Sequence, residues 1–490
     1  MTDTPFALAI IVAACAGLVV LAASRLSSRS GVPLPAVVLF GAAAVGQLAP
    51  SLQRLSPFGV QRVVTVALVL VLFDGGMHLG WGRLRGALAA VGLVGVAGTF
   101  ITAGVAAVAV HLVLGVGWYA ALLVATALAP TDPTVVFSVL GRRRIAGDSG
   151  TVLEAESGAN DPVGIALMAS LVGAGRLGAG QALEVAGTFL EQMGIGLAVG
   201  LLAGRLLLLL MRRLPLPAEG LYPLRTLAAA FAVYAAGALA HGSGFLAVFV
   251  AGIVIGDGRA PFKLEVERFH GALASLGEIV AFAVLGLTVR LPVLGRPDVW
   301  GPALAIWALL AAVVRPLAVG PLLALTGRMR RNERLFVVFA GLKGAVPILL
   351  GGYLFAAHLA DADRLYGVVV VVVALSVVAQ GGTVGVVASR LRLPVSIVEP
   401  QPWAVGVRLP DAPDDVLRVT VRSGSDADGA EVAALDALPA GAWISLLVRD
   451  GRLIAVRGDT RLQAGDDLTI VGVEAGAAHA LARSIGRAAG

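Results

Sequence analysis

Long apolar segments alternate with short polar ones over most of the 490-residue chain. A helix needs about 20 apolar residues to cross a bilayer, and thirteen segments approach or exceed that length. The pattern therefore predicts an all-α polytopic membrane protein with about thirteen spans, at residues 6–23, 33–50, 60–79, 87–114, 118–140, 151–173, 185–211, 222–240, 244–257, 269–289, 299–325, 333–357 and 364–390.

After residue 392 the pattern changes to that of a soluble protein. Short β-like runs occur at Val416–Val421, Trp443–Val448, Arg452–Val456 and Leu468–Val473. The dipeptide Asp450-Gly451 between the second and third runs is a strong hairpin signal. With helical stretches near 429–437 and 475–486, these runs predict a small α+β domain. We expect a membrane domain at 1–392, a proline-rich linker at 393–414 and this small domain at 415–490.

Composition agrees with a membrane location, because 58% of the residues are hydrophobic and only 14% are charged, against about 25% charged in soluble domains. The net charge of +6 comes from basic residues between the spans. Loops that follow odd-numbered spans hold 19 of them and the opposite loops hold 6. The positive-inside rule then places the amino terminus outside and the carboxyl terminus in the cytoplasm of the cell. The partner that this predicts is the lipid bilayer of the cell membrane, with no nucleic acid.

Two motifs inside the apolar segments together carry three clustered acidic residues. Asp132 belongs to the motif Thr131-Asp132-Pro133-Thr134, and the other two belong to Glu156-Ser157-Gly158-Ala159-Asn160-Asp161-Pro162. A charge at the bilayer centre costs roughly 2.5–3.5 kcal/mol on insertion scales, and such residues usually mark ion or proton pathways. The motifs therefore indicate transport.

The second motif gathers oxygen atoms on one side of a helix. Glu156 and Asn160 are four residues apart, as are Ser157 and Asp161, so each pair shares a helix face. Carboxylate, hydroxyl and amide oxygens are the ligands that hard cations prefer. We therefore expect a cation site here.

Proline follows both aspartates, as Pro133 and Pro162. Proline disfavours helix at the preceding residue, so we predict that both helices are unwound at their aspartates. Unwound backbone at this depth lines a cavity or is buried in protein, and ion sites at broken helices are a recurrent transporter design.

A third motif, Gly341-Leu342-Lys343-Gly344-Ala345-Val346-Pro347, places a lysine inside an apolar segment. Its glycines and proline predict another broken helix. Lys343 lies roughly 12 Å into the span at the helical rise, which is deep for a side chain that would extend to the surface. We favour a buried pair with an acid. Asp74, in Phe73-Asp74-Gly75-Gly76, either faces the same cavity or lies at the membrane interface.

Other classes of protein remain open at this point. A single buried acid can pair with a base and hold a helix bundle together. A channel needs no proton coupling, but the chain shows no filter-like repeat of carbonyl donors. Asp132 and Asp161 superficially resemble an aspartyl hydrolase pair, although the amide and hydroxyls beside them suit coordination better. A non-transporting sensor that signals through the tail would not need a buried ion site.

The three motifs together resemble the NhaP-type branch of the monovalent cation:proton antiporters. The tail is similar to the TrkA-type regulatory module, the RCK-C domain, notably at residues 457–462 and 465–472. The combination resembles the potassium/proton antiporters of this group. It implies an NhaA-like fold with inverted repeats and two broken, crossing helices. It also implies a homodimer, a small-molecule regulator at the tail and no cofactor.

The resemblance also assigns roles. Asp161 would bind cation and proton alternately, Asp132 would lie opposite, and Thr131, Ser157 and Asn160 would complete the site. Asp132, Ser157 and Asp161 would hold the monovalent cation, and the Asn160-Asp161 pair marks the electroneutral branch. Glu156 would be structural and paired with Lys343, and Asp74 would be an additional candidate. The family usually has arginine where this chain has Lys343. The cation would be K⁺ or Na⁺, with K⁺ favoured by the tail.

Overall fold

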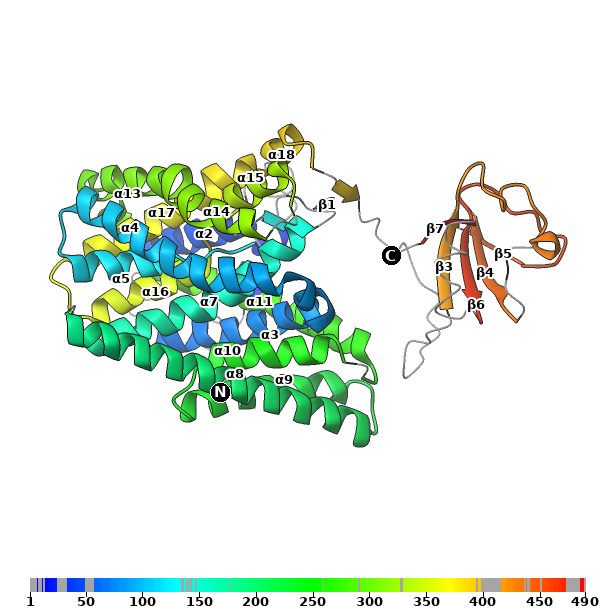
Figure 1. The fold of residues 1–490 in the computed structure, drawn as a ribbon, viewed down its shortest axis with the longest axis horizontal. Coiled ribbons are helices and arrows are strands. Elements are labelled where there is room, and N and C mark those ends of the chain that lie inside the picture. The colour runs from blue at the N-terminus through cyan, green and yellow to red at the C-terminus, as the bar shows by residue number, and fades with distance from the viewer. Residues whose placement is uncertain are drawn as a thin grey trace. The chain divides into compact units, whose positions relative to one another are not determined.

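The structure is a computed structural model. It describes residues 7, 11, 14–23, 33–48, 57–133, 136, 137, 140, 143–145, 148–176, 178–258, 260–289, 291–326, 329–393, 395–397, 416–435, 438, 441–449, 452–472 and 485–488. The chain forms two compact units, Met1–Glu399 and Pro400–Gly490 (Figure 1). The first unit is a bundle of apolar helices and the second is built around a sheet.

Many helices in the described part of the first unit are apolar, and several of them are long enough to cross a membrane. Six helices there are long and apolar enough to cross a membrane: Gly59–Gly80, Val91–Leu114, Gly180–Arg213, Lys263–Thr288, Pro297–Leu325 and Ala362–Arg390. Five shorter apolar helices accompany them: Ala14–Ala23, Leu34–Leu48, Trp118–Leu128, Gly244–Gly256 and Ala345–Ala356. The unit is therefore a helical membrane domain, as the hydrophobic pattern predicts.

One group of helices contains the short helix α10 (Gly244–Gly256), and we call it the α10 group. Three members pack against α10 itself: α3 (Pro57–Ala90), α8 (Ala179–Arg213) and α9 (Leu221–Leu239). The other two, α11 (Lys263–Thr288) and α2 (Leu34–Leu48), join through α3, against which α11 packs, with α2 against α11. Small residues allow close approach: a Cβ at Gly76 of α3 would overlap the carbonyl of Phe249, and one at Gly252 of α10 would overlap that of Phe73. Such contacts are typical of helix packing in membranes.

The α3 helix is longer than the third predicted span. It continues to Ala90 through residues 81–86, which the sequence pattern assigns to a loop, and it kinks at Gly80 with φ of 58°. Glycine adopts positive φ without the steric cost that a Cβ brings. The kink lets the chain change direction and enter the next helix without a separate loop.

The remaining helices form a second group, which we call the α16 group after α16 (Ala345–Ala356). Its other members are η2 (Val91–Ala97), α4 (Gly98–Leu114), α5 (Trp118–Leu128), α7 (Asp148–Ala174), α12 (Leu291–Leu294), α13 (Pro297–Leu309), η3 (Leu310–Val314), α14 (Arg315–Leu325), α15 (Arg331–Phe339), α17 (Ala362–Leu375), η4 (Ser376–Gln380) and α18 (Gly381–Arg390). Helix α7 also packs against α3 and α8, so it lies where the two groups meet.

The first unit also contains a two-stranded antiparallel ribbon. Strand β1 (Arg143–Ile145) pairs antiparallel with β2 (Val395–Ile397), with Arg144 opposite Ser396. β1 lies between the end of the fifth predicted span and α7, and β2 follows α18. The sequence pattern places 395–397 in a linker, so the start of that linker is a strand; residues 398–415 lie outside the described part of the chain.

The second unit contains a five-stranded antiparallel sheet in the order β5-β4-β6-β3-β7. The strands are β3 (Val416–Val421), β4 (Trp443–Arg449), β5 (Arg452–Ile454), β6 (Asp467–Val471) and β7 (Gly486–Ala488). Buried side chains such as Leu447, Leu468 and Ile470 form its core.

The sequence pattern predicts four of these strands, and Arg449 pairs with Arg452 around the expected two-residue turn. The turn itself, Asp450-Gly451, lies outside the described residues. Of the predicted helix at 429–437, only the turn Val432–Ala434 is helical within the described residues. Of the predicted helix at 475–486, only Ile485 and Gly486 are described, and Gly486 begins β7, which pairs with the edge of β3. Residues 473–484 are outside the described part.

Candidate functional site

Two interrupted helices meet near the centre of the α16 group. Helix α5 ends at Leu128, and residues 130–132 that follow it are not helical. Helix α15 ends at Phe339, and residues 341–344 are extended before α16 begins at Ala345. The backbone N–H of Asp132 donates to the carbonyl of Leu342 over 2.8 Å. The two breaks therefore satisfy each other's backbone groups, as a buried non-helical segment in a membrane must.

Both breaks lie where the sequence predicts them. Pro130 and Pro133 flank the first and cannot donate backbone hydrogen bonds. Gly341 and Gly344 lie at the two ends of the second break. At each position a neighbouring side chain leaves no room for a Cβ. A Cβ on Gly344 would overlap the Asp132 carboxylate, and one on Gly341 would overlap the guanidinium of Arg315. The glycines therefore make room for charged side chains as well as for the bend.

Helix α7 differs from the prediction. It runs without a break from Asp148 to Ala174 and contains Pro162. The predicted unwinding at Asp161 is wrong, because a proline inside a helix removes one backbone bond and can be accommodated by a helix that is packed on several sides. The two broken segments are those at Asp132 and Lys343, and the α7 helix passes beside them.

Small residues of the α7 motif bring that helix close to its neighbours. A Cβ on Gly158 would overlap the ring of Phe249 in α10, and one on Gly164 would lie 2.5 Å from Pro130. Ala159 packs against Gly95 of η2. The polar residues of α7 are thereby pressed against the first break, and Glu156, Ser157, Asn160 and Asp161 are all buried.

Glu156 forms a buried ion pair with Arg315 of α14. Their Oε1 and Nη1 atoms are 2.8 Å apart, and Nη2 of the same arginine donates to Oε2 over 3.1 Å. Arg315 also donates to the carbonyls of Val337 and Val338 at the end of α15. The predicted pairing of Glu156 with Lys343 is therefore wrong. The planar guanidinium has five N–H donors in a fixed fork and can bind both carboxylate oxygens as well as two carbonyls, whereas an ammonium has only three donors.

Arg315 is the functional-site residue that the sequence reasoning missed. It lies in the middle of the apolar segment 299–325, followed directly by Pro316. Placing the charge of an arginine at that depth in the membrane costs free energy, as it does for the three acids. The arginine therefore also needs a partner. That signal was present in the sequence, although it could not say which acid Arg315 would meet.

Lys343 has a different role from the one expected. Its side chain is buried, which excludes an extension to the membrane surface. Its Nζ atom donates to the carbonyls of Ala129 and Pro130 over 3.1 and 3.2 Å, at the end of α5. The last carbonyls of a helix lack intrahelical donors and carry partial negative charge. The ammonium thus caps α5, while its backbone N–H donates to Ser376 of η4.

Asn160 and Thr131 join α7 to the first break. The Asn160 amide donates to the Thr131 hydroxyl over 2.8 Å and accepts from the Thr131 backbone N–H over 3.4 Å. The Thr131 hydroxyl in turn donates to Glu156 over 3.4 Å. The pair holds the unwound chain in register with α7 and brings Asp132 and Asp161 to the same region. Ser157 is buried one turn before Asp161 on the same helix face.

Asp161 differs from the other residues of the site in its hydrogen bonding. Its Oδ1 atom is buried and accepts no hydrogen bond from any residue that the structure describes. The charged side chains that act on it electrostatically are Asp132 and Lys343. An unpaired carboxylate oxygen in a buried position costs free energy unless it holds a proton or a cation. The geometry therefore supplies an acid that can take up either one.

Asp74 lies in a separate cluster. It belongs to α3 of the α10 group, and its carboxylate is 3.4 Å from Nδ1 of His78, one turn later. His270 of α11 is fully buried nearby, packs its ring against Phe73 and shares a 2.8 Å hydrogen bond with Thr226. The structure thus groups Asp74 with two histidines and not with the two helix breaks.

Comparison with known proteins agrees with this geometry. Residues 10–390 match the transmembrane sodium/hydrogen exchanger family, which is more than half of the chain. The chain belongs to the sodium/hydrogen exchanger family. It is a membrane-embedded cation:proton antiporter, a transporter rather than an enzyme. Residues 416–484 match the TrkA-C domain, a range that includes strands β3 to β6 of the second unit.

Curated relatives of this exchanger carry several names. The chain is 38% identical over 394 residues to the K(+)/H(+) antiporter NhaP of Alkalimonas amylolytica, covering 79% of this chain and 67% of the relative. It is 30% identical over 460 residues to the K(+)/H(+) antiporter NhaP2 of Shewanella oneidensis, covering 92% and 79%. It is 27% identical over 353 residues to the Na(+)/H(+) antiporter NhaP of Pseudomonas aeruginosa, covering 67% and 81%.

A solved structure supports the fold. The sodium proton antiporter MjNhaP1 of Methanocaldococcus jannaschii superposes on the exchanger with a TM-score of 0.64. The match covers 77% of this chain and 99% of that protein, at 20% sequence identity. The first unit therefore has the helical fold of these antiporters.

Proposed function

We propose that this exchanger swaps one K⁺ for one H⁺ at Asp161, across the membrane of the cell. The observation that carries the proposal is the buried Oδ1 of Asp161, which accepts no hydrogen bond from the described residues and lies under the influence of Asp132 and Lys343 from the two helix breaks. Asp132 supplies a second carboxylate, and Ser157 and Thr131 supply further oxygens. These are the hard ligands that alkali cations and protons share. No cofactor is required for such an exchange.

Competition for one carboxylate couples the two ions. A cation at Asp161 requires the ionised carboxylate, and a proton on that carboxylate removes the charge that holds the cation. Each ion therefore leaves when the other binds. The Asn160 side chain contributes no charge, because an amide is neutral, and its NH2 group donates to Thr131. One proton then replaces one monovalent cation, no net charge crosses, and the membrane potential of roughly 2.3 kcal/mol per charge per 100 mV does not drive the cycle.

The conformational step is alternating access, in which the α16 group moves against the α10 group around the site. Glu156 and Arg315 are structural in this mechanism, since their mutual contacts are complete. Lys343 positions the break of α5. Thirteen spans with inverted repeats, an external amino terminus, a cytoplasmic tail and a homodimer complete the proposed assembly. The TrkA-C unit regulates exchange by binding a small molecule.

The choice of K⁺ rests on similarity. The relatives at 38% and 30% identity are named for K(+), and the one at 27% is named for Na(+). The tail matches the TrkA-C domain as well. Na⁺ or Li⁺ exchange by the same site is the alternative.

Ion fluxes in proteoliposomes with a trapped pH dye test the proposal. Adding K⁺ should change the internal pH without an ionophore, and more strongly than equal Na⁺ or Li⁺. Asp161→Asn should abolish this signal while the protein keeps its helical content and elution volume. Full activity in this variant would remove Asp161 from the mechanism. A signal that requires a proton ionophore would identify a channel, and a rate that follows an imposed potential would contradict one-for-one exchange.

A further inference from the structure

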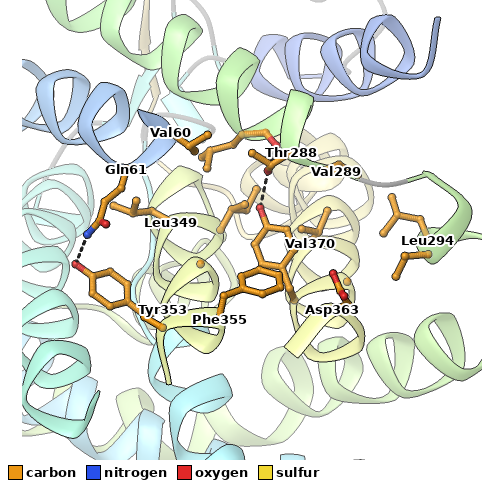
Figure 2. A pocket seen from close by; sticks show the side chains of 17 residues that line it. Val60, Gln61, Thr288, Val289, Leu294, Leu349, Tyr353, Phe355, Asp363 and Val370 are labelled. Carbon is orange, nitrogen blue, oxygen red and sulfur yellow. Dashed lines mark hydrogen bonds between the residues drawn. The ribbon is translucent and has the colours of Figure 1, made fainter. Parts of the chain in front are cut away.

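A cavity of about 620 Å³ lies between the two helix groups and is lined by residues of both. Val60 and Gln61 at the start of α3 line it together with Thr288 at the end of α11, all from the α10 group. Residues of α16 and α17 line the opposite side (Figure 2). Most of the lining is apolar. The cavity lies where relative motion of the two groups would open or close a path.

The cavity reaches towards the ion site along α16. Its lining includes Ala356 near the end of this helix and Ile348 near its start. Ile348 is three residues from Ala345, about 4.5 Å at the helical rise, and Ala345 directly follows the break that faces Asp132. The cavity is therefore placed as the approach to the site from the face where α3 begins. The arginine distribution assigns that face to the outside.

Two tyrosine hydroxyls cross the cavity from the α16 group to the α10 group. Tyr353 of α16 accepts from the Gln61 amide over 2.9 Å. Tyr366 of α17 lies 2.8 Å from the Thr288 hydroxyl. Thr288 gives its own proton to the carbonyl of Leu285, so Tyr366 is the donor to Thr288. Figure 2 shows both contacts.

We propose that Tyr353 and Tyr366 are positioning residues that hold the exchanger in the state in which this cavity is open. The inference rests on the proposed alternating access. A hydrogen bond weakens steeply when donor and acceptor separate by more than a few tenths of an ångström beyond their usual 2.7–3.2 Å. A slide of the α16 group by a few ångströms breaks both contacts together. The two bonds therefore stabilise one state only, and they bias the equilibrium between the two access states.

The effect of each bond on the equilibrium is modest and measurable. A neutral hydrogen bond changes an equilibrium by about threefold to tenfold. Tyr353→Phe and Tyr366→Phe should each lower the ratio of open to closed cavities by that factor. The KM for K⁺ offered on the cavity side should rise by a similar factor, and the KM on the opposite side should fall.

A matched control is available within one helix group. The Tyr119 hydroxyl donates to the carbonyl of Leu171 over 3.1 Å, and α5 and α7 both belong to the α16 group. Tyr119→Phe removes a comparable bond that does not cross between the groups. It should leave the ratio of the two KM values unchanged.

Cysteine accessibility gives a second readout that does not need transport. The chain has a single cysteine, Cys15, so Cys15→Ser with Gly352→Cys reports on the cavity alone. Gly352 lines the cavity, and a Cβ there meets no atom within 4 Å. A membrane-impermeant maleimide should label Gly352→Cys about threefold to tenfold more slowly when either tyrosine is phenylalanine.

Equal labelling in the tyrosine variants and the Tyr119→Phe control would overturn the inference, as would KM values that rise on both sides. Gln61→Leu and Thr288→Val remove the partners and should shift labelling in the same direction, which keeps the test available if a tyrosine variant fails to fold. Normal labelling shifts in a protein without K⁺-driven proton flux would refute the proposed function and leave the positioning role intact.

Discussion

Two carboxylates on α7, five residues apart, have opposite surroundings. Glu156 meets the Arg315 guanidinium through both of its oxygens and also accepts from Thr131. Asp161 keeps one buried oxygen with no hydrogen bond from the described residues. Both side chains are buried and belong to the same helix. Burial alone therefore does not distinguish the paired acid from the one to which we assign ion exchange; the completeness of their partners does.

The difference follows from what each site must do. A carboxylate with a fixed guanidinium partner cannot release it without leaving a buried charge, which is strongly destabilising. A carboxylate that exchanges ions needs a position that its neighbours leave open. The protein places both on one rigid helix, so the complete pair can hold α7 and α14 together while the incomplete site changes its occupant.

The largest expected effect concerns the complete pair. Glu156→Gln should lower the free energy of unfolding by about 3–5 kcal/mol, because the Arg315 charge remains buried without its counter-charge. Arg315→Gln should do the same, and the double variant should lose less than the sum. Thermal unfolding of the purified protein measures this. If Glu156→Gln were as stable as the wild type yet inactive, Glu156 would belong with the exchanging acids.

Alanine substitutions at two glycines of one break should distinguish the Glu156–Arg315 pair from the proposed exchange site. Gly344→Ala pushes against Asp132 and should slow exchange about tenfold to hundredfold, since an ångström of misplacement has that effect on a catalytic group. Gly341→Ala pushes against Arg315 and should chiefly lower stability. Gly352→Ala, in the α16 helix that follows the break and with open space around its Cβ, is the control. Dye-based flux and thermal unfolding should rank the two variants in opposite orders.

Coupling free energies should distinguish the observed partner of Glu156 from the expected one. Residues in one ion-pair network show couplings of about 0.5–3 kcal/mol. The double-mutant cycle with Arg315→Gln should fall in the upper part of that range. The cycle with Lys343→Gln should stay below about 0.5 kcal/mol, because Lys343 binds the α5 carbonyls. Equal couplings would restore the Glu156–Lys343 pair.

The smallest effect is expected at Thr131, whose hydroxyl contacts both regions through Glu156 and Asn160. Thr131→Val removes those two contacts and should cost about 1 kcal/mol of stability and a few-fold in exchange rate. Thr131→Ser keeps the hydroxyl and serves as the control. If Thr131→Val changed only the stability or only the exchange rate, Thr131 would not link the Glu156–Arg315 pair to the proposed exchange site.

Local rules predicted the parts of the site that depend on local sequence. Proline and glycine specified the breaks at Asp132 and Lys343, and both are present. The four-residue spacing placed Glu156 beside Asn160 on one helix face. The strand pattern of the tail predicted four of the five strands, because alternation and turn residues are local as well.

Pairings across the fold were beyond that reasoning. Glu156 and Arg315 are 159 residues apart, and no spacing rule chooses between Arg315 and Lys343 as the partner. Pro162 stayed helical because neighbours pack against α7 on several sides, which a single sequence does not reveal. Strand β7, which begins at Gly486, the last residue of the expected helix, depends on pairing with the edge of β3, more than sixty residues earlier in the chain.

The β1–β2 ribbon determines where a pull from the tail would act. The chain that leaves α18 does not run directly to the second unit; it is first fastened to β1 by three residue pairs. β1 is the short connection between the segment that carries Asp132 and the helix that carries Asp161. Tension or slack in the chain beyond Ile397 is therefore borne by that connection. The connection between the two aspartate-bearing segments is thus also the anchor of the chain that leads to the second unit.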